Sequence, residues 1–478
     1  MITIETAFTH SSSTSFYYWI AFLQMAKQDG LEWVAETFGL EPRWTTEPNI
    51  AKVELLARKH LNIEQNTYCP VTFYAQGAFN KLYKIETEAG CSLMRVTLPV
   101  DPSNKTNSEV ATILFVGQNT DIPVPRIFAF DDSRENELGF EWILMEMLPG
   151  VTLRTRWRKL SKDAKRDLVK EVAKYEAQLS RYKFPVIGNI FLKPGAQLTS
   201  NDSPYIPVLA DTKPAQEENQ QIPVLPVLGQ LVSMIFFWGH HITQDVPRGS
   251  FTDSEDWIRA RLTLILMDQE IILKTSDDED DIEDAEDAKT IATKLLQLLP
   301  STFSSETCSI ELSMLCHDDL SMQNILVDSD GRITGVIDWE CVSALPLWKA
   351  CGLPTFLRGR DRIEEPRNNQ YLPDNDDEDT VDDTIGPTKK VLDNEGVNSL
   401  YWEHLLEYEL TILREVFQKE MGILAPRWNE ESEKGAVKAD FEEAVQNCDS
   451  GWCTKKLKSW LDALEKGNIW DLRRSFLE

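Results

Sequence analysis

The sequence is poor in basic charge and lacks long apolar runs, and each shortage excludes a class of protein. Lysine and arginine together number 49, against 78 aspartate and glutamate residues, which gives a formal net charge of -29. A chain this acidic repels nucleic acid and anionic lipid, so we expect neither nucleic acid nor a membrane as a partner. No apolar run approaches the roughly 20 residues that a transmembrane helix needs.

Cysteine and histidine are too scattered to indicate a metal framework. The eight cysteines form no CxxC pair, and the six histidines show no regular ligand spacing. This pattern is typical of a reducing compartment with ordinary thiols. Glu5 stands where a secretory signal would be basic, and the first arginine is Arg43. We therefore expect a cytoplasmic protein, with a mitochondrial location left open.

The hydrophobic patterns divide the chain into three parts. Helical spacing over 14–62 predicts a helical N-terminal extension over 1–66. Strand patterns dominate 67–148, and helical patterns dominate 149–478. The fold class expected is therefore α+β, with a small antiparallel β lobe that contains one helix and a large, mainly helical lobe. The elements expected are strands near 82–86, 93–96, 126–130 and 142–147, and helices near 106–122, 163–179, 256–273 and 401–420.

Two acidic tracts interrupt the large lobe, at Asp277–Asp287 and Asp374–Asp383. Each tract has few apolar residues, and runs of like charge tend to remain solvated. We expect insertions near 275–290 and 372–385 that do not pack, with a partner-binding role as the alternative.

The most informative segment runs from His317 to Asp338. An apolar lead-in enters the polar run His-Asp-Asp-Leu-Ser-Met-Gln-Asn, which ends at Asn324. Two short apolar stretches then flank Asp330-Gly331 and predict a hairpin. Pairing around this turn places Asn324 opposite residue 337 or 338, so Asn324 and Asp338 meet at the open end of the hairpin.

These residue types suit a magnesium–nucleotide site. Mg²⁺ prefers carboxylate and amide oxygens and fills the rest of its shell with water and phosphate, so Asn324 and Asp338 are candidate metal ligands. Phosphoryl transfer also needs an acid that orients the acceptor hydroxyl, and Asp319 is placed for this role. We expect His317 to organise the loop by hydrogen bonding rather than to carry a proton. Singly, each residue could cap, turn or end a strand, but jointly they indicate phosphotransfer.

This segment resembles the catalytic and metal loops of the aminoglycoside phosphotransferase and choline kinase family, especially its fungal type. The likeness extends more weakly over about 72–357. It implies a fold similar to that of protein kinases, ATP and Mg²⁺ as cofactors, and a hydroxyl of a small molecule as the acceptor. The resemblance also implies that Asp319 is the catalytic base, that Asn324 and Asp338 bind the metal, and that His317 organises the loop.

The resemblance assigns a cation and its partner in the small lobe. Arg95 stands where the family has lysine, and arginine can still hold phosphate oxygens, although its geometry and hydration differ. Glu109 is the candidate partner of Arg95. In the alternative, Thr106-x-x-Glu109 forms a capping box, and Glu109 serves only the start of a helix.

The remaining nucleotide contacts are expected at two turns. Gly77 lies within 75–80, the candidate loop over the phosphates, although a single glycine fits an ordinary hairpin turn equally well. Glu146 and Met147 end an apolar strand that would offer backbone hydrogen bonds to adenine, or that is simply a core strand before a turn. The small lobe therefore has candidates for each nucleotide-binding function.

Two other functions fit parts of the pattern. A protein kinase has arginine before its loop aspartate, whereas Asp318 stands here, and neither Asp-Phe-Gly nor Ala-Pro-Glu follows. An inactive pseudokinase, acting as a scaffold or ligand-binding protein, would explain Arg95 but not three converging oxygen donors. We therefore expect an ATP-dependent phosphotransferase with an alcohol acceptor. The acidic balance suits a cationic acceptor such as an amino sugar or a choline-like amine, and it equally serves solubility.

Overall fold

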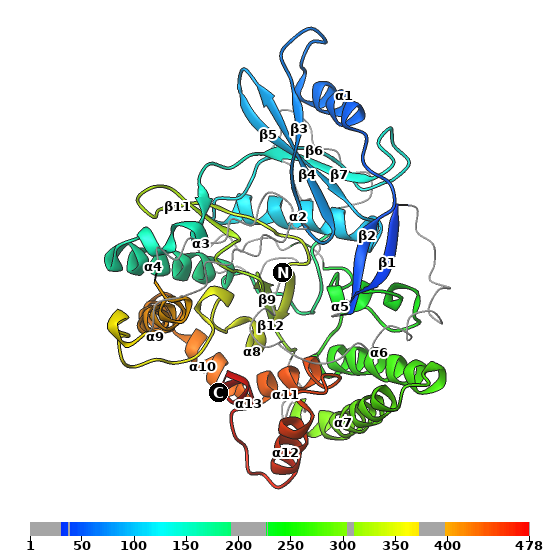
Figure 1. Ribbon diagram of the computed structural model, residues 1–478, viewed down its shortest axis with the longest axis vertical. Coiled ribbons are helices and arrows are strands. Elements are labelled where there is room, and N and C mark those ends of the chain that lie inside the picture. The colour runs from blue at the N-terminus through cyan, green and yellow to red at the C-terminus, as the bar shows by residue number, and fades with distance from the viewer. Residues whose placement is uncertain are drawn as a thin grey trace, which may run out of the picture.

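The computed structural model describes residues 30–36, 39–192, 226, 228–303, 310–371 and 397–477. A sheet-rich lobe from the N-terminal part of the chain sits on a larger, mainly helical lobe (Figure 1). This arrangement confirms the predicted α+β fold with two lobes. None of the described helices combines the length and the apolar character needed to cross a bilayer. The cysteines in the described part of the chain are all free thiols.

The small lobe is built on a five-stranded antiparallel sheet. In spatial order its strands are β3 (Val71–Gln76), β4 (Asn80–Thr87), β5 (Gly90–Thr97), β7 (Glu141–Glu146) and β6 (Ile127–Asp131). Successive side chains of a strand point to opposite faces. Trp142 and Leu144 of β7 pack in one cluster with α1 (Ile50–Leu61), whereas Ile143 and Met145 pack in another with α2 (Asn104–Asn119). The two helices therefore cover opposite faces of the sheet.

The N-terminal extension corrects the helical prediction. Leu31–Glu36 (β1) and Gly39–Trp44 (β2) form an antiparallel hairpin, and only the helix after it, α1, was expected correctly. Leu31 and Trp33, two residues apart on β1, point to the same face of the strand and pack in one cluster with Phe79 and Leu98 of the small lobe. This contact with the sheet lobe outweighs local helix propensity. The helix expected over 14–29 lies outside the described residues.

The large lobe consists mainly of helices packed around one extended apolar core. Its helices are α3 (Leu153–Arg156), α4 (Lys162–Leu179), α5 (Met234–Phe237), α6 (Ser254–Thr275), α7 (Glu279–Phe303), α8 (Leu347–Ala350), α9 (Ser399–Leu424), α10 (Arg427–Lys434), α11 (Ala436–Gln446), α12 (Thr454–Glu465) and α13 (Leu472–Leu477). Helix α4 packs against α9, and α6 packs against α7. The predicted helices near 163–179, 256–273 and 401–420 are confirmed as α4, α6 and α9.

The first acidic tract corrects a second prediction, because it is not an unpacked insertion. It forms the start of α7, with Glu279–Asp281 in the first turn, where the helix dipole favours negative charge. Ala285 and Ala288 are buried, so small residues between the acids supply a packing face. The second tract, at 374–383, lies outside the described residues.

Short strands frame the His317–Asp338 segment at the base of the small lobe. They are β8 (Val151–Thr152), β9 (Ser313–Cys316), β10 (Ile325–Val327), β11 (Ile333–Val336) and β12 (Ser343–Pro346). Strand β10 lies between β11 and β8, and β9 pairs with β12. Because Cys316 pairs with Ser343, the two ends of the segment are held together. The predicted hairpin of 325–336 is confirmed.

Candidate active site

The polar loop between β9 and β10 is held by one asparagine. Asn324 Nδ2 donates to the backbone oxygen of Asp319 at 2.9 Å and to Asp319 Oδ2 at 3.1 Å. Asn324 is buried, so these contacts fix the direction of the Asp319 carboxylate. Both bonds use the amide nitrogen, which leaves the side-chain oxygen of Asn324 to serve as a ligand atom.

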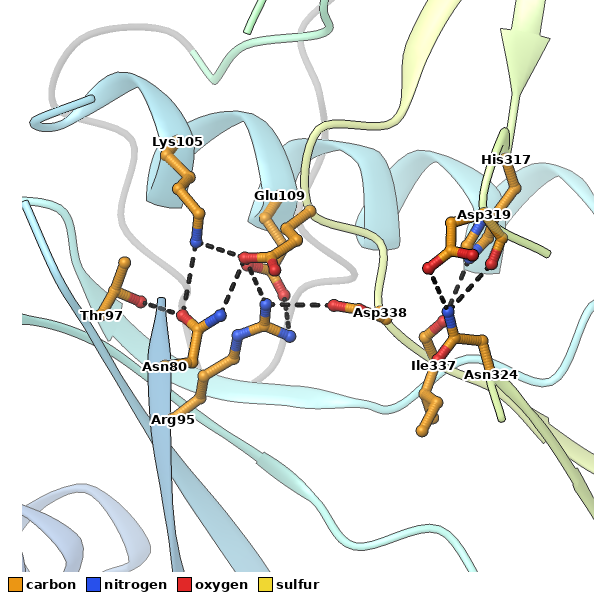
Figure 2. A network of polar contacts seen from close by, with 11 residues as sticks. Asn80, Arg95, Thr97, Lys105, Glu109, His317, Asp319, Asn324, Ile337 and Asp338 are labelled. Atoms are coloured by element: carbon orange, nitrogen blue, oxygen red, sulfur yellow. Dashed lines mark hydrogen bonds and ion pairs between the residues drawn. The ribbon is translucent and has the colours of Figure 1, made fainter. Parts of the chain in front are cut away.

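The hairpin brings Asp338 next to this loop. Ile325 pairs with Val336, and the Ile337 N–H donates to the Asn324 carbonyl oxygen at 2.9 Å. Asn324 therefore lies opposite residue 337, one of the two predicted registers. Asp338 follows with a φ of 65°, a conformation that aspartate adopts more readily than most residues. Its carboxylate lies between the Asp319–Asn324 pair and the charges of the small lobe (Figure 2).

His317 links the loop to the hairpin. Its Nε2 lies 3.1 Å from the carbonyl oxygen of Ile337, which can only accept, so Nε2 is the donor. The ring is buried and packs edge-on against Trp339, with ring centroids 4.9 Å apart. These contacts join the backbone before Asp338 to the loop that carries Asp319.

Arg95 bridges the two lobes. Its neighbours on β5, Met94 and Val96, pack on the α1 side of the sheet, so Arg95 projects toward α2. Nη1 lies 3.0 Å from Glu109 Oε1, and Nη2 lies 3.2 Å from Asp338 Oδ1. The side chains of Arg95 and Glu109 are 8% and 1% exposed, so this ion pair is shielded from water.

The structure decides between the two explanations of Glu109. Helix α2 begins at Asn104 with Ser103 as its N-cap, so Thr106 lies inside the first turn and cannot start a capping box. Glu109 lies a full turn further on and contacts Arg95. The predicted contact between Arg95 and Glu109 is therefore present.

Two members of this charge cluster were not predicted, namely Lys105 and Glu340. Arg95 Nη2 lies 2.6 Å from Glu340 Oε2, and Lys105 Nζ contacts the same oxygen. Asn80 Nδ2 donates to this oxygen as well, at 2.9 Å, while Asn80 Oδ1 lies 3.3 Å from Lys105 Nζ. The sequence carried a signal for both residues. Lys105 precedes Glu109 by one helical turn, and Glu340 follows Asp338 by two residues.

Burial and mutual attraction set the ionisation of the cluster. Burial raises the pKa of Glu109 to about 7, although Arg95 and Lys105 act to lower it. Burial also opposes the ionisation of Glu340, but Lys105 and Arg95 outweigh it and lower the pKa of Glu340. Burial and the charge of Glu340 raise the pKa of Asp338. A cation bound beside Asp338 would favour its ionised form.

The other predicted residues lie at opposite ends of β5. Gly77 is in the turn from β3 to β4, where its N–H donates to Asn80 O at 2.9 Å, and an added Cβ would meet no atom within 4 Å. Glu146 pairs with Ser92 at the other end of β5. Met147 follows β7 and has no backbone hydrogen bond with any described residue. The structure does not bring Gly77 and Met147 together, and Arg95 lies between them along the sheet.

One family model and several known proteins are similar to this chain. A family model described as the Phosphotransferase enzyme family matches residues 70–348. A subtelomeric hrmA-associated cluster protein of Aspergillus fumigatus is 25% identical over 365 residues, 67% of this chain and 67% of its own length. The mitochondrial protein "Altered inheritance of mitochondria protein 9" of Vanderwaltozyma polyspora is 26% identical over 302 residues, 57% of this chain and 46% of its own length.

A solved structure is similar at lower identity. The ADP-bound crystal structure of the aminoglycoside phosphotransferase APH(2'')-Ib aligns with 87% of this chain and 99% of its own length, at 11% identity and a TM-score of 0.42. The family match, by contrast, covers more than half of the chain and includes each site residue from Gly77 to Glu340. The chain therefore belongs to the Phosphotransferase enzyme family.

Proposed function

We propose that this protein transfers the γ-phosphoryl group of ATP to a hydroxyl group of a small molecule. The observation that carries the proposal is the position of Asp338, which lies between the Asp319–Asn324 pair and the cations Arg95 and Lys105 (Figure 2). Such a site offers an acid to the acceptor, oxygen ligands to a metal and positive charge to phosphates. Membership of a phosphotransferase family supports this chemistry.

Asp319 would act on the acceptor hydroxyl. Its Oδ2 is held by Asn324, so the carboxylate has a fixed orientation when the acceptor arrives. In the reaction, the acceptor oxygen bonds to the γ-phosphorus, the bond from that phosphorus to the β–γ bridging oxygen breaks, and ADP leaves. Asp319 accepts the proton of the hydroxyl, and His317 holds the loop in place by its bond to the Ile337 carbonyl.

Asn324 and Asp338 would hold Mg²⁺. The donors fit this ion, because Asn324 keeps an amide oxygen beyond its contact with Asp319, and Asp338 supplies a carboxylate from the facing strand. When bound, Mg²⁺ neutralises negative charge on the phosphates. Arg95 contacts Oδ1 of Asp338 at 3.2 Å, which is long for a charge-assisted hydrogen bond, so the other carboxylate oxygen would serve as the metal ligand.

The small lobe would bind the nucleotide along β5. Arg95 would hold phosphate oxygens while Glu109 fixes its guanidinium, and the turn at Gly77 would cover the phosphates. The open backbone of Met147, directly after Glu146, would accept adenine at the other end of the sheet. An extended nucleotide suits this spacing, because its base and phosphates lie at opposite ends.

We divide these tasks among three regions of the chain. Residues 67–148 would bind the nucleotide, residues 149–478 would carry catalysis and acceptor binding, and residues 1–66 would form an extension. The net charge of -29 favours a cationic acceptor such as an amine-bearing alcohol. The helices of the large lobe, next to the loop that carries Asp319, would form the acceptor site.

Nucleotide binding tests the proposal before any acceptor is known. We expect ATP to raise the thermal unfolding midpoint of the full chain, and Mg²⁺ to increase this shift. Asp338→Asn should remove the additional effect of Mg²⁺ but keep most of the effect of ATP alone. A midpoint that does not respond to ATP, with or without Mg²⁺, would contradict the proposal.

A further inference from the structure

Two adjacent histidines meet one aspartate in the large lobe, away from the candidate active site. His240 lies next to the 3₁₀ turn η2 (His241–Thr243), and Asp268 lies on α6. His240 Nε2 is 3.1 Å from Asp268 Oδ1, and His241 Nε2 is 2.7 Å from Asp268 Oδ2. One ligand atom from each residue lies within 4.8 Å of the other two. The two imidazoles therefore converge on a single carboxylate.

The hydrogen bond made by the other ring nitrogen of His241, Nδ1, fixes the position of the ring proton. His241 Nδ1 lies 2.6 Å from the carbonyl oxygen of Ile235, which can only accept, so Nδ1 carries the proton. A neutral His241 would then direct the lone pair of Nε2 at an oxygen of Asp268, and the two would repel each other. The short contact therefore requires either a proton between Nε2 and the carboxylate oxygen or a metal ion bound to both.

The donor set and its surroundings match a metal site. Imidazole nitrogen and carboxylate oxygen bind Zn²⁺ at about 2.0–2.2 Å, so neighbouring ligand atoms lie about 3.3 Å apart in a tetrahedral shell. The distances of 2.7 and 3.1 Å need only a small expansion to reach this spacing. A histidine that binds metal through Nε2 usually donates its Nδ1 proton to a carbonyl or carboxylate, as His241 does.

A fourth ligand is within reach. The side-chain amide of Gln244 approaches Asp268 Oδ1 at 3.5 Å, and its Oε1 is buried without a hydrogen-bond partner among the described residues. The oxygen and nitrogen of a side-chain amide can exchange places by a half turn about the last bond. That half turn would direct Gln244 Oε1 toward the space that His240, His241 and Asp268 surround.

We propose that His240, His241 and Asp268 bind a divalent transition-metal ion, of which Zn²⁺ fits the donors best, with Gln244 or water as the fourth ligand. All three side chains are at most 24% exposed, so the site is sheltered but open to an ion from solvent. The ion would tie the turn at His241 to the middle of α6. This structural site is independent of the phosphotransferase proposal.

The segment that the ion would hold also contacts the small lobe. Phe237 and Trp238, just before the histidines, pack against Phe79 with ring centroids 5.5 and 5.8 Å away. Arg248 shapes the same segment without a metal, because its guanidinium donates to the carbonyl oxygens of Phe236, His241 and Gln244. We therefore expect protein stripped of metal to fold, and to be less stable than the loaded form.

Metal content of the full chain, with any affinity tag removed, tests this inference. We expect purified protein to contain zinc at about one ion per chain, and the stripped protein to regain thermal stability when Zn²⁺ is added in the presence of excess Mg²⁺. Cobalt should replace zinc and give the visible absorption of a tetrahedral site. His241→Ala and Asp268→Asn should each raise the dissociation constant for Zn²⁺ by about 100-fold or more.

Two control variants test whether Zn²⁺ binds at the His240–Asp268 cluster rather than elsewhere on the protein. His60→Ala removes a histidine from α1, and Asp338→Asn alters the candidate magnesium site, so both should bind Zn²⁺ as the unmodified protein does. The inference is overturned if stripped, unmodified protein takes up neither Zn²⁺ nor Co²⁺ and its unfolding midpoint does not change. The cluster would then be an ion pair between protonated histidine and Asp268. This decision uses the unmodified chain, so it stands even if a variant fails to fold.

Discussion

Arg95 and Lys105 contact the same oxygen of Glu340, one from strand β5 and the other from the first turn of α2. Glu340 comes from the large lobe, two residues after Asp338, so this oxygen joins the lobes. Lys105 thereby brings a second buried cation beside Arg95.

The contribution of Arg95 can be measured with Arg95→Lys. Lysine keeps the charge but loses the planar fork that reaches Glu109 and Glu340 at once. Because one charge-assisted hydrogen bond is worth about 1.5–3 kcal/mol, we expect kcat/KM for ATP to fall about 10- to 100-fold. The exposed hairpin variant Arg43→Lys is the matched control and should leave kinetics unchanged. Equal kcat/KM for Arg95→Lys and the unmodified protein would exclude a phosphate contact by Arg95.

Lys105 is expected to stabilise the fold as well as to bind phosphate. Lys105→Met leaves Glu340 with less compensating charge in a buried site, which should cost about 3–5 kcal/mol in the free energy of unfolding. Adding Glu340→Gln should restore most of this stability, because the uncompensated charge is then removed. Urea denaturation of the single and double variants measures the coupling. Additive losses would show that Lys105 and Glu340 do not stabilise each other.

Asp319 and Asp318 are adjacent in the sequence, but substitution of Asp319 should reduce turnover far more than substitution of Asp318. Asp319→Asn removes the proton acceptor, so we expect turnover to fall about 100- to 10,000-fold while ATP affinity is retained. Asp318→Asn is the neighbouring control. The Asp318 backbone carbonyl accepts a bond from Thr355, which the substitution leaves intact, so activity should change far less. Single-turnover kinetics with saturating Mg²⁺-ATP separates the two, and similar losses in both would remove Asp319 from the chemical step.

Glu176, buried on α4, should make stability depend on pH. Burial raises its pKa from 4.5 to about 7, so the folded protein holds this proton over a range in which the unfolded chain releases it. The contribution of the protonated Glu176 to the free energy of unfolding is fully present below pH 4.5 and is lost as the pH rises through 7. Glu176→Gln stays neutral, and it should be more stable than the unmodified protein at pH 8, by up to about 3 kcal/mol.

Denaturation at two pH values checks this prediction. At pH 5 the difference between Glu176→Gln and the unmodified protein should shrink toward zero, because Glu176 is then protonated in the fold. Glu171→Gln, on the same helix but solvent-accessible and paired with Lys174, should show no such pH-dependent gain. A constant difference at both pH values would mean that Glu176 does not titrate between them.

Most of the fold could be predicted because its elements have strong local periodicity. Helices α4, α6 and α9 and the strands β4, β5, β6 and β7 match their predicted positions within a few residues. The hairpin of β1 and β2 could not be predicted, because its stability comes from contacts with Phe79 and Leu98, which are distant in the sequence. The acidic start of α7 was missed because its alanines were not counted as a packing face.

The proximity of the candidate site residues could be predicted where they share one segment of the chain, but not where they come from distant segments. The length of a single hairpin limited the register of Asn324 to residue 337 or 338, and the structure has residue 337. Glu340 and Lys105 were overlooked because their contact joins residues more than 200 positions apart, on different lobes. The His240–Asp268 cluster has no regular ligand spacing, since the turn and α6 meet only in the folded chain. Contacts of this kind can be identified only from the folded structure.

Detection of a phosphorylated acceptor is the most direct test of the proposed reaction. The protein and its Asp319→Asn variant would be incubated with Mg²⁺-ATP and a panel of hydroxyl-bearing amines, amino sugars and neutral alcohols, followed by mass spectrometry. We predict that one acceptor class gains the mass of a phosphoryl group, that ADP forms in equal amount, and that the variant yields almost none. ATP binding without any phosphorylated acceptor across the panel would contradict the proposal and favour a protein that binds nucleotide as a scaffold.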